Sequence, residues 1–385
     1  MPPSNPAWDA ADYRFMARAI RLARRGLFTT DPNPRVGCVL ARGGDVVGEG
    51  WHERAGLPHA ERNALTQAGE AARGATAYVT LEPCCHVGRT GPCTRALLAS
   101  GVRRVVGAMT DPNPRVSGQG FAELEGAGVR VETGLMALEA EALNPGFCQR
   151  FRQGRPFVRC KLAMSLDGRT AMSSGESQWI TGPPARRDVQ RLRARSSAIL
   201  TGLGTVLTDN PSLTVRPEEW APDAPYGDAA NIPVRQPLRV VLDPKLATPL
   251  EAAILRSGEA PTLLIAASDH WAEDRAEAIR GTGTQVAEVP GVDDALDLRR
   301  VMEYLAECEI NEVLLECGAR LAGAMLREGL IDELIVYLAP TLMGSDARGL
   351  FALPEIRRMA DRRHLEIAGI RPVGRDWRIT ARPVA

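Results

Sequence analysis

The sequence predicts an α/β protein with two domains. Apolar runs rich in Val, Ile and Leu alternate along the whole chain with segments whose apolar residues recur every three or four positions. The length of 385 residues is enough for two or three domains, each with its own core. A stretch that mixes Pro, Gly and Arg, residues 144–156, interrupts the alternation. We therefore expect one domain over residues 1–150 and a second over residues 151–385.

The first half shows the alternation of a layered domain. Asp9 begins a helical pattern that continues to Gly26, and a Gly43-Gly44 turn joins the first two apolar runs. Pro58 is typical of a helix start, so His59 and Glu61 should lie at the N-terminus of a helix and face one pocket. The predicted strands are 36–40, 46–50, 76–81, 102–109 and 129–133, and the predicted helices are 9–26, 59–72, 93–98, 118–127 and 135–143.

The second half repeats this alternation over a longer segment. A pair of runs joined through Gly374-Arg-Asp is typical of a hairpin, and Leu296–Cys308 has a helical pattern. Residues 218–235, rich in Pro, Ala and Asp, have no periodicity and are expected to form a surface insertion. The predicted strands are 157–163, 198–202, 238–242, 262–266, 313–317, 334–339, 365–370 and 377–381.

Composition excludes several classes of protein. Lys plus Arg and Asp plus Glu both number 47, so no overall field would attract a nucleic acid. No apolar stretch approaches the roughly 18 residues of a membrane span, and Met1–Trp8 has no targeting pattern. We expect a cytoplasmic protein. Eight cysteines are too few for a disulfide scaffold, and five are expected to be reduced core residues: Cys38, Cys148, Cys160, Cys308 and Cys317.

His59, Cys84 and Cys93 form the candidate metal site. A hydrolytic zinc centre needs three protein ligands and one open position, and these residues supply one imidazole and two thiols. Glu61 is then free to move protons. A His-x-Glu sequence followed by Pro-Cys and a further Cys is typical of zinc-dependent base deaminases. Eight residues separate the two cysteines where the general pattern has two, so the loop between them is long enough to contact substrate.

A closed zinc knuckle is the alternative interpretation. Cys85 would then be a fourth ligand and the protein a zinc-stabilised binding module. Neighbouring residues on an extended loop tend to point apart, so we expect Cys85 to point away. Glu61 would also have no role in a closed site.

Two loop motifs bear on ligand binding. Asp-Pro-Asn-Pro-Arg-Val occurs at 31–36 and 111–116, and Asn33 is the better candidate for contacting substrate, whereas the second copy is equally consistent with a plain turn. No Gly-x-Gly-x-x-Gly opens a helix after a strand. Gly318 follows an apolar strand and begins a helix, a geometry that offers backbone N–H groups to a pyrophosphate, although a tight turn alone would also explain it.

Together these motifs resemble the bifunctional deaminase/reductase family of riboflavin biosynthesis, nearly from end to end. His59-Ala-Glu61 with Thr80-Leu-Glu-Pro-Cys84 resembles the deaminase half. Lys161–Ala171, Gly175–Ile180, Asp209–Arg216 and Leu338–Gly344 resemble the reductase half. The resemblance implies a cytidine-deaminase-like α/β/α first domain and a dihydrofolate-reductase-like α/β second domain. It also implies Zn²⁺ and a phosphoribosylaminopyrimidine substrate that is deaminated and then reduced on its sugar.

The resemblance also implies site residues in the second half. Lys161 and Glu316 would flank the reacting carbon of the sugar. The residues that would bind the substrate are Ser177, Arg193, Leu213, Arg216 and Glu316, and the two arginines would hold its phosphate. The cofactor would be bound by Ala163, Trp179, Thr205, Asp209, Gly318, Ala319, Arg320, Leu321, Ala322, Gly323 and Ala324. NADPH is the implied cofactor. NADH stays open, because Pro244, Lys245 and Ala247 stand where the family often has the Ser and Arg that meet a 2′-phosphate.

Two rival functions and the assembly complete the expectations. A tRNA or free-base deaminase fused to an unrelated domain would use the same zinc motif, but the chain lacks a basic run for RNA. A non-catalytic zinc module leaves Glu61 unexplained. We expect a homo-oligomer with a small-molecule substrate and neither nucleic acid nor membrane as partner.

Overall fold

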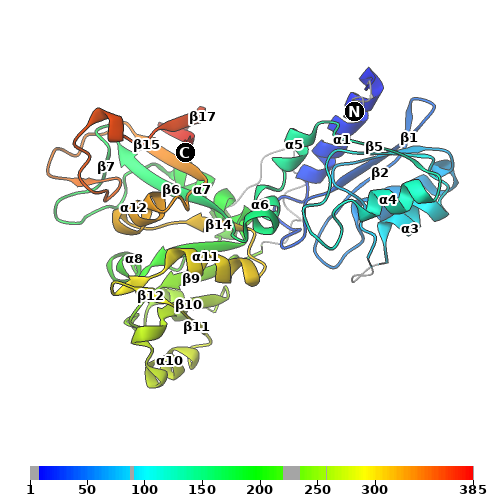
Figure 1. The fold of residues 1–385 in the computed structure, drawn as a ribbon. Coiled ribbons are helices and arrows are strands. Elements are labelled where there is room, and N and C mark those ends of the chain that lie inside the picture. The colour runs from blue at the N-terminus through cyan, green and yellow to red at the C-terminus, as the bar shows by residue number, and fades with distance from the viewer. Residues whose placement is uncertain (1–7, 87–90, 220–234, 257, 385) are drawn as a thin grey trace. The chain divides into compact units, whose positions relative to one another are not determined.

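The computed structural model describes residues 8–86, 91–219, 235–256 and 258–384 (Figure 1). The described residues form two compact units, which divide between Gln153 and Gly154. Each unit has its own sheet and its own apolar core. Within the described ranges, every helix is too short or too polar to cross a membrane. Most of the predicted insertion at 218–235 lies outside the described residues.

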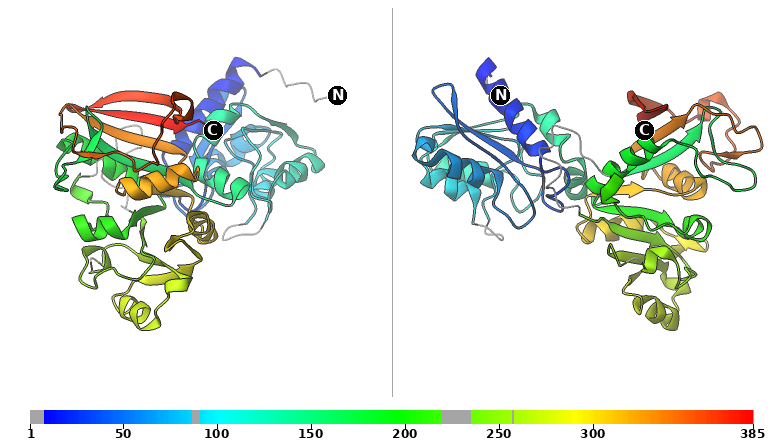
Figure 2. Two further views of the ribbon diagram at one scale, coloured as in Figure 1. Left: turned by 60° about the vertical axis from the view of Figure 1, so that its left-hand side comes forward. Right: turned by 180° about the vertical axis from the view of Figure 1, so that it is seen from behind.

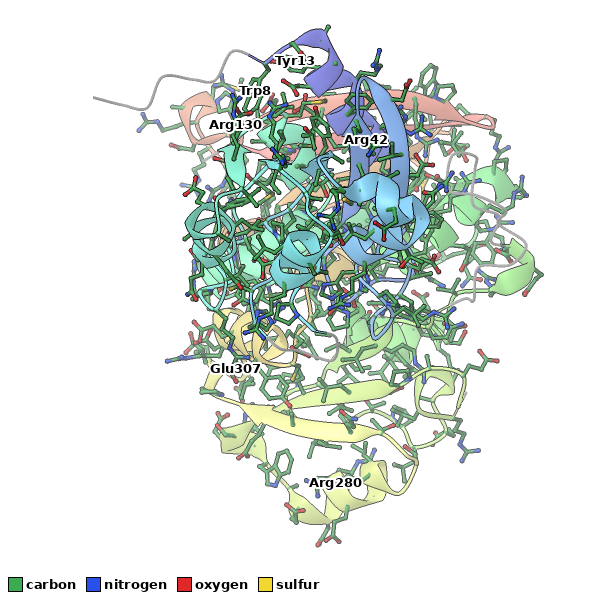
Figure 3. All side chains as sticks on the ribbon, turned by 90° about the vertical axis from the view of Figure 1, so that its right-hand side faces the viewer. Trp8, Tyr13, Arg42, Arg130, Arg280 and Glu307 are labelled. Carbon is green, nitrogen blue, oxygen red and sulfur yellow. The ribbon has the colours of Figure 1, made fainter. Side chains whose placement is uncertain are left out.

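The first unit is built on a mixed five-stranded sheet with strand order β2-β1-β3-β4-β5. The pairs β2–β1 and β1–β3 are antiparallel, whereas β3, β4 and β5 run parallel. Figure 3 labels Arg42 at the end of β1 and Arg130 at the start of β5, which is an edge strand of this sheet. The elements in chain order are α1 (Ala10–Arg24), β1 (Gly37–Arg42), β2 (Asp45–Trp51), α2 (Ala60–Ala68), β3 (Thr76–Val79), α3 (Cys93–Ala99), β4 (Arg104–Gly107), α4 (Gln119–Gly126), β5 (Arg130–Thr133), α5 (Ala137–Glu141) and α6 (Pro145–Gln153).

Helices cover both faces of this sheet. Val39 on β1 and Tyr78 on β3 belong to the core cluster that contains residues of α1, α5 and α6, whereas their neighbours Leu40 and Val79 belong to the cluster that contains residues of α2, α3 and α4. This alternation follows from the two-residue period of a strand. The expected α/β/α layering is therefore present.

Two elements of the first unit illustrate why the sequence folds this way. Asp9 caps α1, because its side chain accepts a hydrogen bond from the Asp12 backbone N–H while Asp12 accepts one from that of Asp9. Residues 144–156, where we placed the domain boundary, are mostly helical. Phe147 and Cys148 of α6 are buried in the first core, which is why the first unit continues to Gln153.

The second unit is built on a nine-stranded sheet with strand order β11-β10-β9-β8-β14-β6-β15-β18-β17. The strands from β11 to β15 are parallel, and β15, β18 and β17 are antiparallel. The main elements are β6 (Phe157–Ser165), α7 (Pro183–Arg195), β8 (Ala198–Gly202), α8 (Leu203–Asp209), β9 (Leu238–Leu242), α9 (Ala253–Arg256), β10 (Thr262–Ala267), α10 (Glu273–Arg280), β11 (Gln285–Val289), α11 (Leu298–Glu307), β14 (Glu312–Leu315), α12 (Ala319–Arg327), β15 (Glu333–Ala339), β17 (Leu365–Val373) and β18 (Asp376–Pro383).

The core of the second unit also lies on both faces of its sheet. One face packs against α11 and α12, and the other against α7, α9 and α10. The views in Figure 2 show the C-terminal strands and the β9–β11 region at opposite ends of this unit. Each strand predicted for this half is present, and the hairpin joined through Gly374 is confirmed. Strand β11 and helices α7 and α10 correspond to no specific prediction from the sequence.

Candidate active sites

The three predicted metal ligands converge in the first unit. Their donor atoms all lie within 4.8 Å of one another. The His59 Nδ1 atom is 3.6 Å from the Cys84 Sγ atom and 3.4 Å from the Cys93 Sγ atom. The ring therefore presents Nδ1 to the two sulfurs. One imidazole and two thiols at this spacing are a donor set suited to zinc.

Local structure explains this convergence. His59 is the N-cap residue of α2, Cys93 is the first residue of α3, and Cys84 lies five residues after the end of β3. The backbone N–H of Cys93 donates to the Cys84 sulfur at 3.4 Å. Hydrogen bonding from the Cys93 thiol, and then from His59, holds the pKa of Cys84 well below its usual value. A thiolate is the form that binds a metal.

The position of α2 is set by close contact with β2. A Cβ atom on Gly48 would lie 2.3 Å from the Ala64 carbonyl oxygen, and one on Gly50 would lie 2.6 Å from that of Ala60. Only glycine leaves room for this approach. The helix that carries His59 and Glu61 therefore packs directly on the backbone of the sheet.

Glu61 lies beside the metal cluster without joining it. Its side chain is only 3% exposed, and it is not among the three residues whose donor atoms converge. Burial raises the pKa of Glu61. A buried carboxyl group with a raised pKa, next to a metal site, is suited to carrying a proton between water and a leaving group.

Cys85 does not join the ligand cluster either. Its thiol is half-buried and lies outside the group of converging donor atoms. Burial raises the pKa of this thiol, which favours the neutral form. Within residues 8–86 and 91–219, the cluster has three ligands, as predicted for an open site. Residues 87–90 of the Cys84–Cys93 loop lie outside the described residues, so the predicted substrate contacts of that loop stay a prediction.

Asn33 is linked to the metal cluster through His52. The Asn33 Nδ2 atom is 3.0 Å from the His52 Nε2 atom, and the His52 ring packs edge-on against His59 with 5.2 Å between centroids. Burial lowers the pKa of His52, so the ring is neutral. Its Nδ1 atom lies 3.2 Å from the Pro58 carbonyl oxygen and must donate to it, which leaves Nε2 to accept from Asn33. The Asn33 amide oxygen then faces away from His52.

Glu82 and Asp111 are two buried carboxyl groups that the sequence analysis missed. Glu82 accepts hydrogen bonds from the backbone N–H groups of Asp111, Gly118 and Gly120 at 3.0, 2.9 and 2.8 Å. It therefore anchors the second Asp-Pro-Asn-Pro-Arg-Val loop beneath the cysteine loop. Burial raises the pKa of Asp111 to about 6. The signal in the sequence was a charged residue directly after an apolar strand, at the edge where sites form.

Lys161, Arg193 and Glu316 come together in the second unit. Lys161 is on β6 and Glu316 follows β14, and these strands are paired in parallel with Leu315 opposite Cys160, so the two charged residues are neighbours. Arg193, in the last turn of α7, donates from Nε and Nη2 to the two carboxylate oxygens of Glu316 at 2.7 and 3.0 Å. The arginine and glutamate side chains are 13% and 12% exposed. The structure thus brings the two predicted catalytic residues together.

The predicted cofactor residues gather at the carboxyl ends of neighbouring strands. Ala163 is on β6. Thr205 and Asp209 are on α8, which begins directly after β8. Gly318, three residues after the end of β14, is the N-cap residue of α12 and has no side chain with which to cap that helix. Open α/β sheets bind nucleotides at this edge, where free helix N–H groups can hold phosphates.

Other residues of α12 have a structural role. A Cβ atom on Gly323 would lie 2.2 Å from the Ala352 carbonyl oxygen, so this glycine permits close packing. Ala322 is buried in the core. Ala319, Arg320, Leu321 and Ala324 complete the predicted cofactor segment on this helix.

The remaining predicted residues of the second unit differ in exposure. Trp179 is 65% exposed, with the guanidinium group of Arg186 stacked 4.6 Å from its ring centroid, and Ser177 is half-buried on the same loop. Leu213 is buried with a positive φ of 50°. Arg216 is 42% exposed and pairs with Glu219 at 3.1 Å. It is the more accessible of the two arginines expected to hold the phosphate.

Lys245, which stands in the turn where the family often has residues that meet a 2′-phosphate, pairs with Asp294. The distance between Lys245 Nζ and Asp294 Oδ1 is 3.0 Å, and His270 Nε2 lies 3.0 Å from the same oxygen. All three side chains are at least partly exposed. The lysine therefore lies after the carboxyl end of β9, in reach of solvent.

Comparison with known proteins assigns both halves. Residues 9–109 match the family model described as the cytidine and deoxycytidylate deaminase zinc-binding region, and residues 156–379 match the RibD C-terminal domain. The chain is 51% identical over 369 residues to the riboflavin biosynthesis protein RibD of Escherichia coli, covering 95% of this chain and 97% of that protein. It is 45% identical over 385 residues to RibD of Haemophilus influenzae, covering 98% of each.

Solved structures give the same result. Form 1 of RibD from Acinetobacter baumannii aligns with a TM-score of 0.87 and 43% identity, covering 97% of this chain and 99% of that one. A diaminohydroxyphosphoribosylaminopyrimidine deaminase/5-amino-6-(5-phosphoribosylamino)uracil reductase from Thermotoga maritima aligns with a TM-score of 0.81 and 30% identity, again covering 97% and 99%. The expected fold of both halves is confirmed by these matches.

Proposed function

Because the chain belongs to the RibD family of bifunctional riboflavin-biosynthesis enzymes, we propose that its two side-chain clusters are the active sites of its two consecutive reactions. The enzyme uses Zn²⁺ to deaminate a diaminopyrimidinone that carries a phosphoribosylamino group, and NADPH to reduce the ribosyl chain of the product to ribityl. The match over residues 156–379 excludes a deaminase fused to an unrelated domain. The convergence of His59, Cys84 and Cys93 beside Glu61 is the observation that carries the assignment of the first site.

In the deaminase site, His59, Cys84 and Cys93 hold the zinc. When bound, zinc lowers the pKa of a coordinated water and makes it a nucleophile toward the ring carbon that bears the amino group. Glu61 takes the proton from the attacking water and delivers it to the departing ammonia. Its burial keeps solvent from competing for that proton. Asn33, whose amide nitrogen is held by His52, uses its free carbonyl oxygen to accept a hydrogen bond from an N–H of the pyrimidine.

In the reductase site, Lys161 and Glu316 flank the sugar. When bound, the nicotinamide supplies a hydride to C1′ of the opened ribose. The reduced chain then needs one proton, and the Lys161 ammonium is placed to donate it or to stabilise the oxygen freed by ring opening. Glu316 orients the lysine and the sugar hydroxyls. The half-exposed Arg216 holds the 5′-phosphate, with Ser177 and the backbone at Leu213 beside it.

The cofactor is assigned to the carboxyl edge of β6, β8 and β14. The backbone N–H groups of Ala319, Arg320 and Leu321 at the uncapped start of α12 face its pyrophosphate, and Gly318 leaves that approach open because no atom lies within 4 Å of its missing Cβ. Ala163, Trp179, Thr205 and Asp209 line the path. Lys245 meets the 2′-phosphate by exchanging its exposed partner Asp294 for the ligand.

The chain is further proposed to act as a cytoplasmic homo-oligomer. Strand β17 is the edge of the nine-stranded sheet, and three of its apolar side chains are largely exposed: Leu365 by 47%, Ile367 by 60% and Ile370 by 56%. An apolar edge strand of this kind would aggregate unless another chain covers it. All eight cysteines are unpaired, which suits a reducing compartment. An Ile367→Lys variant that keeps the wild-type mass in light scattering would contradict this interface.

A coupled assay tests the function. Ammonia release from the phosphoribosylaminopyrimidine is measured with zinc present and after chelation, and NADPH oxidation is then measured on the deaminated product. We expect ammonia release to stop on chelation and to return with zinc, while NADPH oxidation on preformed product continues. Release that is unaffected by chelation would refute the zinc assignment. Equal release from cytidine or adenosine would refute the substrate.

A further inference from the structure

Arg193 uses most of its hydrogen-bond donors on acceptors within the protein, although a residue that binds a phosphate would be expected to keep them available. Its Nε and Nη2 atoms hold both oxygens of Glu316, and its Nη1 atom donates to the Thr214 carbonyl oxygen at 2.9 Å. Three of its five N–H donors are thus used by protein acceptors. A bidentate fork fixes a carboxylate in both distance and orientation. The guanidinium group therefore ties Glu316 to the segment that follows α8.

In this arrangement Lys161 has no hydrogen-bonding or ion-pair partner among the described residues, although Glu316 is on the adjacent strand. Its Nζ atom lies 5.9 Å from the centroid of the Tyr337 ring on β15. Lys161 is half-buried, and an ammonium group that is withdrawn from water normally pairs with a carboxylate. Here the available carboxylate is already held by Arg193.

The charges around Lys161 and Glu316 are consistent with Glu316 being paired with Arg193 and not with Lys161. Burial lowers the pKa of Lys161; Glu316 opposes that effect, and Arg193 on α7 adds to it. Burial opposes ionisation of Glu316, but Arg193, with smaller contributions from Lys161 and Arg216, holds the pKa of Glu316 below its usual value. The carboxylate therefore stays charged, and the lysine is not locked in a salt bridge.

We propose that Arg193 is a positioning residue of the reductase, which clamps Glu316 so that the Lys161 ammonium remains free for the sugar. The proposal rests on the reductase roles proposed above for Lys161 and Glu316. It assigns Arg193 a function different from that of Arg216, whose guanidinium group pairs, among the residues that the structure describes, with the half-exposed Glu219 and can turn to a phosphate. The family resemblance grouped both arginines as phosphate ligands, but their contacts separate them.

Arg193→Gln and Arg216→Gln form a matched pair of variants. NADPH oxidation is measured on the deaminated substrate and on the same substrate without its 5′-phosphate, the latter also in single turnover with enzyme in excess. For Arg193→Gln we expect kcat to fall about a hundredfold, as for a catalytic group misplaced by about 1 Å, with KM changed by less than about threefold. The same loss should persist without the phosphate. For Arg216→Gln we expect KM to rise about tenfold or more, with kcat nearly unchanged, and the effect should disappear without the phosphate.

Two further measurements keep the test decisive. The dissociation constant of NADPH and the circular dichroism spectrum show whether the second unit is folded. Arg193→Lys retains the charge but cannot form the fork, so it should also lose most of kcat. A rise in KM alone in Arg193→Gln, or wild-type kcat in Arg193→Lys, would overturn the proposal. Full activity in Lys161→Met would instead overturn the proposed function, whatever Arg193 does.

The pH profile of kcat provides an independent readout. If Lys161 donates a proton, activity is lost as the pH rises through its pKa. The groups that face it are Glu316, Arg193, the neighbouring Cys160 and the Tyr337 ring. Removing Arg193 frees Glu316 to pair with the lysine, so the basic limb should move up by about one pH unit. An unmoved basic limb in Arg193→Gln would contradict the clamp.

Discussion

Glu61→Gln separates proton transfer from metal binding in the first unit. The substitution keeps the shape of the side chain but removes its ability to take a proton. General acid–base catalysis contributes roughly 10²–10⁴-fold, and we expect the upper part of this range, because Glu61 is only 3% exposed and bulk water cannot replace it. At 1.36 kcal/mol per factor of ten, a loss of about 10⁴ corresponds to about 5 kcal/mol of transition-state stabilisation. The three ligands stay in place, so zinc content should remain at one per chain.

The assay combines ammonia release with metal analysis of the same protein sample. Glu82→Gln is the matched control, since Glu82 is equally buried but spends its oxygens on the backbone N–H groups of Asp111, Gly118 and Gly120. That variant should lose stability and keep kcat within about tenfold in its folded fraction. Loss of zinc from Glu61→Gln in step with activity would show that the carboxylate is a ligand, and our reasoning would fail. A kcat within tenfold of wild type would refute the proton-transfer role.

Three other predictions follow from the described contacts. Cys85→Ser should keep one zinc per chain, near-normal ammonia release and an unchanged spectrum after cobalt substitution; a spectral change would make Cys85 a ligand. Lys161→Met should lower NADPH oxidation by about 10²-fold or more while NADPH affinity and ammonia release stay within about threefold, and wild-type oxidation rates would end that assignment. Asp111→Asn should stabilise the first unit near pH 7 by at most about 3 kcal/mol, because burial raises the pKa of Asp111 from 3.8 to about 6 and the native state therefore loses stability as the pH rises through that window. Denaturant unfolding should show the stability difference between variant and wild type growing from pH 4 to pH 6; a constant difference would contradict the prediction.

The strands and the metal ligands could be predicted because their signals are local. Each predicted strand is a short apolar run, and the periodicity that marks α1 begins at a capping residue, Asp9. The three proposed ligands were predicted from residue type and spacing alone, and their donor atoms lie close together in the structure. His52 was not predicted because its importance comes from a tertiary contact to Asn33 that no spacing in the sequence encodes. Asp111 had a local signal, its position after an apolar strand, but its contact with Glu82 is again tertiary.

The different roles proposed for Arg193 and Arg216 also could not be predicted from the sequence. Arg193 and Arg216 have the same side chain and are both near the ends of elements, so a pattern cannot distinguish them. The difference arises from the sheet order, which places β14 between β8 and β6 and brings Glu316 within reach of the last turn of α7. Long-range pairing of strands far apart in the chain is the information that a single sequence does not show directly.

Gly48 and Gly50 are important for the geometry of the deaminase site, although neither is a proposed contact of its metal or its substrate. Because the carbonyl oxygens of Ala64 and Ala60 occupy the space of their missing side chains, even a single methyl group would push α2 off the sheet and carry His59 with it. The distances between the His59 imidazole and the two sulfurs therefore depend on β2 having no side chains at these two positions. In a saturation-mutagenesis survey scored by growth without added riboflavin, these two positions should tolerate as few substitutions as the zinc ligands themselves. The positions found to be essential would then include the contact between β2 and α2 as well as the catalytic residues.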